Sequence, residues 1–191
     1  MAVPPPSPGA DKRTLRRRLR DARDAFVAGD PPAIEAPAPF LALLRPGLTI
    51  AGYRPLGSEA DPARLVQAAL DHGCTLALPH VVDRDGALRF LVWHPDHALH
   101  PGPFGLEQPH DESDEVRPDI ILAPLVGYDH ALHRLGQGAG HYDRAFAALP
   151  DARRIGVAWS VQHVDPLPAD PWDVPLHAVI TEQGWIERTE P

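Results

Sequence analysis

The residues with the clearest potential for chemistry lie in one segment, 134–144, which reads RLGQGAGHYDR. Three glycines alternate with other residues in it, and a glycine backbone can approach a ligand closely because it carries no Cβ. The segment follows an apolar run, Ile120–Val126, and precedes a stretch of helical character at 142–149. A glycine loop between a strand and a helix start is typical of an anion site, because backbone N–H groups and the helix N-terminus favour phosphate.

Two charged residues of this segment extend the argument. Arg134 carries a full positive charge for a phosphate, and Asp143 falls in the first helical turn, where a carboxylate is stabilised and can hold a divalent cation. The segment is not a Walker loop, because His141 and Tyr142 stand where lysine and serine or threonine are needed. It also lacks the glycine spacing of the dinucleotide fingerprint. On the glycines alone, a structural turn is an equally good interpretation.

The surrounding elements must form a sheet that positions this loop. Apolar runs predict strands at 48–53, 75–78, 88–93, 120–126, 154–159 and 177–181. Helical spacing predicts helices at 11–26, from Asp61-Pro62 onward and at 142–149, while the polar, proline-rich segment 94–118 is expected to be a loop. The alternation predicts an α/β fold: a single-domain three-layer sandwich with a mostly parallel sheet and helices on both faces. Ligands in such folds bind at the carboxyl ends of the strands.

Composition limits the class of protein. We expect residues 1–10 to form a disordered proline-rich tail and residues 11–187 to form the domain. A net charge of −8 argues against general nucleic-acid binding, and no apolar run is long enough to span a bilayer. The single cysteine, Cys74, fits a reducing compartment. We therefore expect a cytoplasmic monomer with small-molecule partners and without nucleic-acid or membrane partners.

The complete segment 134–144 resembles the signature of the 5-formyltetrahydrofolate cyclo-ligases, also called 5,10-methenyltetrahydrofolate synthetases. The resemblance runs in family order from Lys12 to Thr181. It also rests on a basic helix with Lys12 and Arg16, on Tyr53–Asp61, on Phe90–Trp93, on Gly105–Pro109 and on Asp173–Leu176. It implies that ATP and Mg²⁺ are used to convert 5-formyltetrahydrofolate to 5,10-methenyltetrahydrofolate, with release of ADP and phosphate. The formyl oxygen would be phosphorylated, and the folate N10 would then close the ring.

The resemblance further implies roles for individual residues. Lys12, Arg16 and Arg134 would act on the phosphates during catalysis. The ATP site would comprise Lys12, Arg13, Arg16, Arg134, Leu135, Gly136, Gln137, Gly138, Ala139, Gly140, His141 and Tyr142. The folate site would comprise Arg54, Glu59, Trp93, Gln137, Gly138, Ala139, Gly140 and His141, with Glu59 paired to the pterin edge. Asp143 and Asp173 would hold Mg²⁺.

Other interpretations remain open at the level of sequence. The arginine-rich first helix also fits a non-catalytic module that binds a nucleotide or RNA, and the glycine loop also fits a different ATP-dependent ligase. Lys12 and Arg16 could be solvated helix charges, and Trp93 could belong to the core. Ala139 and His141 depart from commoner versions of the family motif, which leaves the role of His141 undefined.

Overall fold

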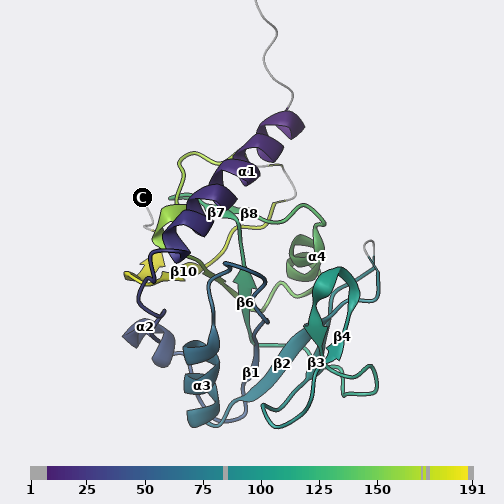
Figure 1. Ribbon diagram of the computed structural model, residues 1–191. Helices are drawn as coiled ribbons and strands as arrows, with labels where there is room; N and C mark the ends of the chain where they lie inside the picture. Colours follow the sequence, from purple (N-terminus) through teal and green to yellow (C-terminus); the bar gives the residue numbers. More distant parts are fainter. Residues whose placement is uncertain (1–7, 84–85, 169, 171–172, 189–191) are drawn as a thin grey trace, which may run out of the picture.

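A seven-stranded sheet with the order β11-β10-β9-β6-β1-β2-β3 carries the fold (Figure 1). The computed structural model describes residues 8–83, 86–168, 170 and 173–188. The strands are β1 (Thr49–Ala51), β2 (Thr75–His80), β3 (Arg89–Val92), β6 (Ile120–Pro124), β9 (Arg153–Val157), β10 (Ala178–Thr181) and β11 (Gly184–Glu187). Strands β10, β9, β6, β1 and β2 are parallel to their neighbours within this group, and the edge strands β3 and β11 are antiparallel. The predicted mostly parallel sheet is therefore confirmed.

The central strands are apolar on both faces because helices cover both. β6 and β10 are buried along almost their whole length, as expected for parallel strands between helix layers. One core joins the sheet to α2 (Ala38–Leu41) and α3 (Ala63–Asp71), and a second joins it to α4 (His141–Ala148). In Figure 1, α3 and α4 lie on opposite sides of β6. This confirms the three-layer arrangement.

The first helix, α1 (Pro8–Val27), packs on the rest of the protein through its middle and its C-terminal end. Leu19 is buried against Val126, Leu135 and Leu167, and the ring of Phe26 lies 5.8 Å from that of Trp159. The helix begins three residues before the predicted start, at a proline that suits a first helical turn because its missing N–H would have no partner there. Residues 8–10 of the predicted tail lie in the first turn of this helix, and residues 1–7 lie outside the described residues.

Short elements account for the other differences from expectation. The predicted loop at 94–118 contains a ribbon of β4 (His100–Pro101) and β5 (Glu107–Gln108) around a 3₁₀ turn, η1 (Pro103–Gly105). A second small hairpin, β7 (Gly127–Tyr128) and β8 (Arg134–Leu135), separates β6 from the glycine loop, so that loop does not follow the sheet strand directly. β11 and a 3₁₀ turn, η2 (Ser160–Gln162), were also not predicted. The two-residue strands are too short to show a period in the sequence.

The remaining predicted strands and helices agree with the structure to within a few residues at each end. At the start of α3, the side chain of Asp61 accepts a hydrogen bond from the N–H of Ala63 (2.9 Å), while the N-cap position is Pro62, so the helix begins one residue later than a cap at Asp61 would give. None of the helices in the described part of the chain is both long enough and apolar enough to cross a bilayer.

Candidate functional site

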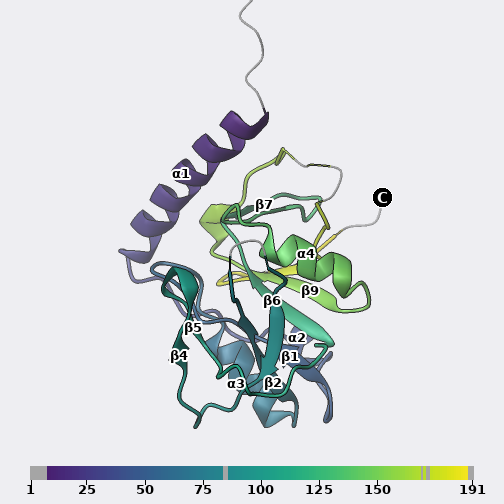
Figure 2. The same ribbon diagram turned by 90° about the vertical axis from the view of Figure 1, so that its right-hand side faces the viewer.

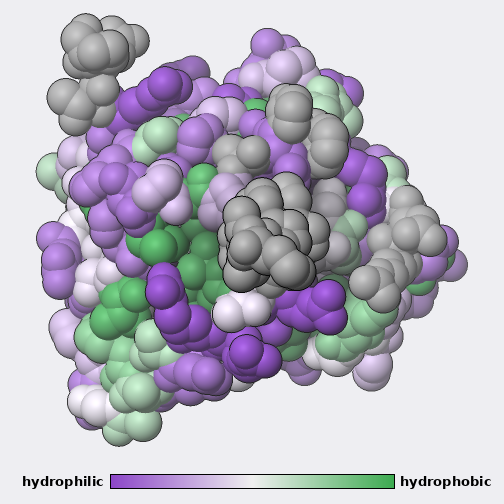
Figure 3. Space-filling view, turned by 90° about the horizontal axis from the view of Figure 1, so that it is seen from above, coloured by the Kyte–Doolittle hydropathy of each residue, from purple (hydrophilic) through white to green (hydrophobic). Residues whose placement is uncertain are grey.

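A cavity of about 640 Å³ lies at the carboxyl ends of the central strands. Tyr53, Pro79 and Pro124, at or just beyond the ends of β1, β2 and β6, form part of its wall. Viewed from above, apolar residues line the floor of a hollow that hydrophilic residues surround (Figure 3). The predicted position of the ligand site relative to the sheet agrees with this cavity.

Five parts of the chain, far apart in sequence, enclose the cavity. In Figure 2, α1 and the β4–β5 ribbon lie on one side of the molecule and α4 on the other, and all three contribute lining residues. α1 contributes Lys12 and Arg16, and the loop after β1 contributes Arg54, Leu56 and Glu59. Segment 134–143 lines a long stretch of wall, and Asp170 and Asp173 close it from the loop before β10.

The glycine loop has the backbone geometry of an anion site. Gly138 (φ +110°) and Gly140 (φ +71°) have left-handed conformations that favour glycine, and Gly140 immediately precedes α4. The guanidinium of Arg16 lies beside the loop: its Nε donates to the carbonyl of Gly136 (2.8 Å), and a Cβ on Gly138 would lie 3.6 Å from its central carbon. The loop, the N-terminus of α4 and a cation therefore face the same space, which suits a phosphate.

Arg134 is held rigidly in this wall. Its side chain is 4% exposed, its Nη2 donates to Oδ1 of Asp143 at 2.8 Å, and its guanidinium lies 5.5 Å from the ring centres of both Tyr142 and Phe146. Burial raises the pKa of Tyr142, as does the negative charge of Glu59, so this phenol stays protonated in the neutral range. Arg134 is thus a fixed positive charge at the base of the glycine loop.

Lys12 bridges α1 to the loop before β10. Its ammonium lies 2.6 Å from Oδ2 of Asp170 and 3.2 Å from Oδ2 of Asp173, and the N–H of Asp170 also donates to Asp173 (2.7 Å). Burial lowers the pKa of Lys12, but the hydrogen bonds to the two aspartates outweigh burial, and the net pKa is raised. Lys12 is therefore positively charged at neutral pH and available to a phosphate. Asp170 was missed at the sequence level, where only its spacing of three from Asp173 gave a signal.

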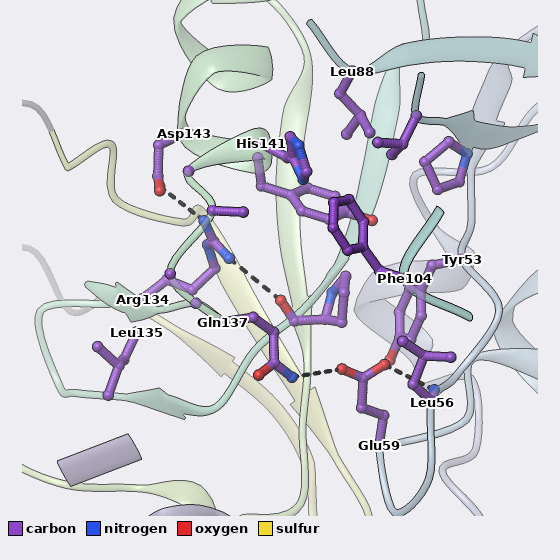
Figure 4. Close-up of a pocket in the computed structure, with 18 of the residues that line it drawn as sticks. Tyr53, Leu56, Glu59, Leu88, Phe104, Arg134, Leu135, Gln137, His141 and Asp143 are labelled. Atoms are coloured by element: carbon purple, nitrogen blue, oxygen red, sulfur yellow. Dashed lines mark hydrogen bonds and ion pairs between the residues drawn. The ribbon is translucent and has the colours of Figure 1, made fainter. Parts of the chain in front are cut away.

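Glu59 forms the opposite wall (Figure 4). It is only 9% exposed; its Oε2 accepts from the N–H of Leu56 and its Oε1 from the side-chain amide of Gln137, both at 3.0 Å. The buried Tyr53 packs nearby, and burial, together with the charge of Glu59, raises the pKa of its hydroxyl well above the usual value. Glu59 is thus a fixed acceptor that faces the cavity.

Two of the predicted site residues lie elsewhere. Arg13 is exposed and does not line the cavity, because neighbouring helix residues point about 100° apart and Lys12 takes the inward direction. Trp93 lines a separate cavity of about 140 Å³ and donates its Nε1–H to the carbonyl of His97 (3.0 Å). Every other predicted residue lines the main cavity.

The cavity also has an apolar part that sequence reasoning missed, formed by Leu56, Val81, Leu88, Phe104 and Leu106. Phe104 lies in the 3₁₀ turn between β4 and β5, is 61% exposed, and has a positive φ of 60°. Its ring centre lies 6.4 Å from that of His141 across the cavity mouth. An exposed aromatic in a strained conformation at the rim of a cavity is suited to pack on a flat ligand.

The residues predicted to hold Mg²⁺, Asp143 and Asp173, carry carboxylate oxygens, which are ligands that suit this ion. Asp143 and Asp173 both line the cavity, and both act electrostatically on Arg16, whose pKa is lowered mainly by burial and also by Arg20. Among the described residues no group of three or more His, Cys, Asp or Glu side chains is arranged to hold a metal ion. Two carboxylates suffice for Mg²⁺ when phosphate oxygens and waters complete its shell.

Comparison with known proteins gives a consistent result. Residues 8–182 match the model of the 5-formyltetrahydrofolate cyclo-ligase family. The chain is 32% identical over 141 residues to the 5-formyltetrahydrofolate cyclo-ligase of Escherichia coli (strain K12), covering 70% of this chain and 77% of that protein. It is 33% identical over 150 residues to the enzyme of the same name from Mycolicibacterium smegmatis, covering 73% and 76%.

Two solved structures resemble the fold. The 5,10-methenyltetrahydrofolate synthetase of Mycoplasma pneumoniae superposes with a TM-score of 0.68 at 26% identity, covering 90% of this chain and 99% of that one. The synthetase of Aquifex aeolicus superposes with a TM-score of 0.64 at 27% identity, covering 92% and 84%.

Proposed function

The chain belongs to the 5-formyltetrahydrofolate cyclo-ligase family, and we propose that it uses ATP to convert 5-formyltetrahydrofolate to 5,10-methenyltetrahydrofolate, releasing ADP and phosphate. The observation that carries this proposal is a single cavity with two chemically different halves. One half has a glycine loop with Lys12, Arg16 and Arg134, and suits a triphosphate. The other has the buried carboxylate of Glu59 and apolar walls, and suits a pterin. The volume of the whole cavity, about 640 Å³, is within the range of about 300–1,000 Å³ that is usual for small-molecule sites.

The reaction needs the formyl oxygen to become a leaving group. This oxygen attacks the γ-phosphorus, and the bond from phosphorus to ADP breaks. N10 then attacks the formyl carbon, the carbon–oxygen bond breaks with loss of phosphate, and N10 gives up its proton. Such phosphoryl transfer depends on positioning and on charge stabilisation more than on covalent help from the protein.

Individual residues divide this work. Lys12, Arg16 and Arg134 neutralise the phosphate oxygens, and the backbone of the glycine loop holds them in place. Glu59 accepts two N–H donors from the pyrimidinone edge of the pterin, which turns the formyl group toward the phosphates. Asp143 and Asp173 would hold Mg²⁺, which when bound supplies further neutralisation of the phosphate charge. The carboxylates of Asp170 and Asp173 keep the ammonium of Lys12 oriented.

Direct assay tests the proposal. Purified protein incubated with 5-formyltetrahydrofolate, ATP and Mg²⁺ is expected to accumulate the methenyl chromophore together with one ADP per turnover. Omission of ATP or addition of EDTA should stop product formation. Folded protein that binds ATP but yields no methenyl product over a range of pH and metal concentration would disprove the assignment and favour the non-catalytic nucleotide-binding module. Salt-sensitive binding of RNA in its place would favour an RNA-binding module.

Lys12→Ala tests the nucleotide half. We expect a rise in the KM for ATP of roughly tenfold or more, because a charge-assisted hydrogen bond to phosphate is lost. Arg17→Ala is the matched control, since Arg17 is exposed on the same helix and does not line the cavity. Equal KM values for ATP in wild type and Lys12→Ala would remove α1 from the phosphate site.

A further inference from the structure

Gln137 belongs to the glycine loop, yet its side chain reaches the opposite wall of the cavity. Its Nε2 donates to Oε1 of Glu59 (3.0 Å), and its Oε1 accepts from Nη2 of Arg20 on α1. It therefore connects the phosphate half of the cavity to the pterin half (Figure 4). We propose that Gln137 is a positioning residue for the folate substrate, which it serves by fixing the carboxylate of Glu59. This inference rests on the function proposed above.

Glu59 has acceptor capacity left for a ligand. An ionised carboxylate has about four acceptor positions, two on each oxygen. The N–H of Leu56 occupies one on Oε2, and the amide of Gln137 occupies one on Oε1. One position remains on each oxygen, which is the arrangement that two parallel N–H donors of a 2-aminopyrimidinone edge require. Leu56 and Gln137 together therefore fix the plane of the carboxylate and leave the right acceptors free.

Arg20 and Glu59 fix the orientation of the Gln137 amide. Arg20 has only donors, so it selects the carbonyl oxygen of Gln137 and turns the NH₂ group toward Glu59. Arg16 holds the neighbouring Gly136 through its carbonyl (2.8 Å), so the backbone beneath Gln137 is also anchored to α1. The amide is thus held at both ends. Such preorganisation means that Glu59 need not be reoriented when the pterin arrives.

The backbone and the side chain of Gln137 serve different halves of the cavity. Phosphate recognition by a glycine loop uses backbone N–H groups, which a change of side chain at Gln137 leaves in place. The side chain of Gln137 is engaged by Arg20 and Glu59. A substitution at this position should therefore alter folate binding and spare ATP binding, although the residue lies in the nucleotide motif.

Two substitutions isolate the interaction. Gln137→Met keeps the length of the side chain but removes both polar contacts. Gln137→Glu keeps an acceptor for Arg20 and replaces the donor that faces Glu59 by an oxygen. Calorimetric titration with 5-formyltetrahydrofolate, without turnover, is expected to give a Kd raised roughly tenfold for Gln137→Met, because a hydrogen bond to a charged group is lost. The increase should be larger for Gln137→Glu, because two carboxylates then face each other. The Kd for ATP of the neutral variant Gln137→Met should stay within about twofold of wild type.

Gln67 offers a matched control. It lies on α3, outside the main cavity, and its amide also donates to a carboxylate, Oδ1 of Asp71 (2.9 Å). Gln67→Met and Gln67→Glu should leave both Kd values unchanged, and thermal melting will show whether each variant is folded.

The outcomes separate this inference from the proposed function. An unchanged or tighter Kd for folate in Gln137→Met, or a raised Kd for ATP with folate unaffected, would overturn the role of Gln137 while wild-type turnover still supported the function. Folate binding without turnover in the wild type would count against the function, and the ranking of the Gln137 variants would still decide the positioning role. A wild type that binds no 5-formyltetrahydrofolate would overturn both.

Discussion

Glu59→Gln is expected to raise the KM and Kd for 5-formyltetrahydrofolate by roughly 30-fold or more, because loss of a charge-assisted pairing in a buried site costs about 2–5 kcal/mol. Glutamine replaces one acceptor oxygen of this 9%-exposed side chain by a donor. That donor must then face the N–H of Leu56, the amide of Gln137 or the pterin N–H groups, all of which are donors themselves. The Kd for ATP should change little, because Glu59 lies on the wall that we propose for the pterin.

Steady-state kinetics with each substrate varied in turn, together with calorimetry, measure this separation. Glu35→Gln is a suitable control, because Glu35 is an exposed carboxylate paired with Arg64 that does not line the cavity. If the folate constants of Glu59→Gln equal those of the wild type, Glu59 is not a substrate ligand. If the KM for ATP rises in parallel, the variant has disturbed the whole cavity rather than its pterin half.

Gly138→Val is expected to abolish measurable ATP binding. Gly138 has a φ of +110°, which a β-branched residue does not tolerate, and its Cβ would lie 3.6 Å from the guanidinium of Arg16. The loop must then adopt another backbone conformation, which turns its N–H groups away from the phosphates. The loop lies at the surface of the cavity, so the loss of stability should be modest, on the order of 1–3 kcal/mol.

Gly47→Val separates backbone strain from loss of the site. Gly47 also has a positive φ, +87°, but a Cβ at this position would have open space around it, with no described residue beyond its chain neighbours within 4 Å. Gly47 does not line the cavity. The variant should lose stability in denaturant unfolding and keep wild-type affinity for ATP. Retention of ATP affinity by Gly138→Val would show that the loop backbone does not hold phosphate.

Most strands of the sheet could be predicted from sequence, because each of them is marked by a run of consecutive apolar residues. The run at 120–126 is apolar along its length, and the run at 177–181 is apolar at its centre, as strands covered on both faces must be; helical stretches between strands favour parallel pairing. The ribbons β4–β5 and β7–β8 could not be predicted, because two residues carry no period. Their pairing depends on the sheet and loops around them.

The site was predictable where helix geometry or a continuous motif fixed it. Lys12 and Arg16 are one helical turn apart, so both face the cavity, and the motif at 134–143 lines it without interruption. Asp170 was not predictable, because its partner Lys12 lies 158 residues away and only the fold brings them together. Trp93 was assigned to the folate site from the family resemblance, but β3 is an edge strand and Trp93, just beyond its end, lines the smaller cavity.

The docking of α1 distinguishes two populations of molecules: those whose sheet is folded, and those that are also competent to bind ligands. This helix contributes Lys12 and Arg16 to the cavity wall beside the glycine loop and supports Gln137 through Arg20. It is not part of the seven-stranded sheet. A local opening of α1 would dismantle the phosphate half while the seven-stranded sheet stayed intact, and such sub-global openings cost less free energy than complete unfolding. On the function proposed above, the docking equilibrium of one helix sets the fraction of competent molecules, and ATP, which would bind only the docked state, would shift that equilibrium in its own favour.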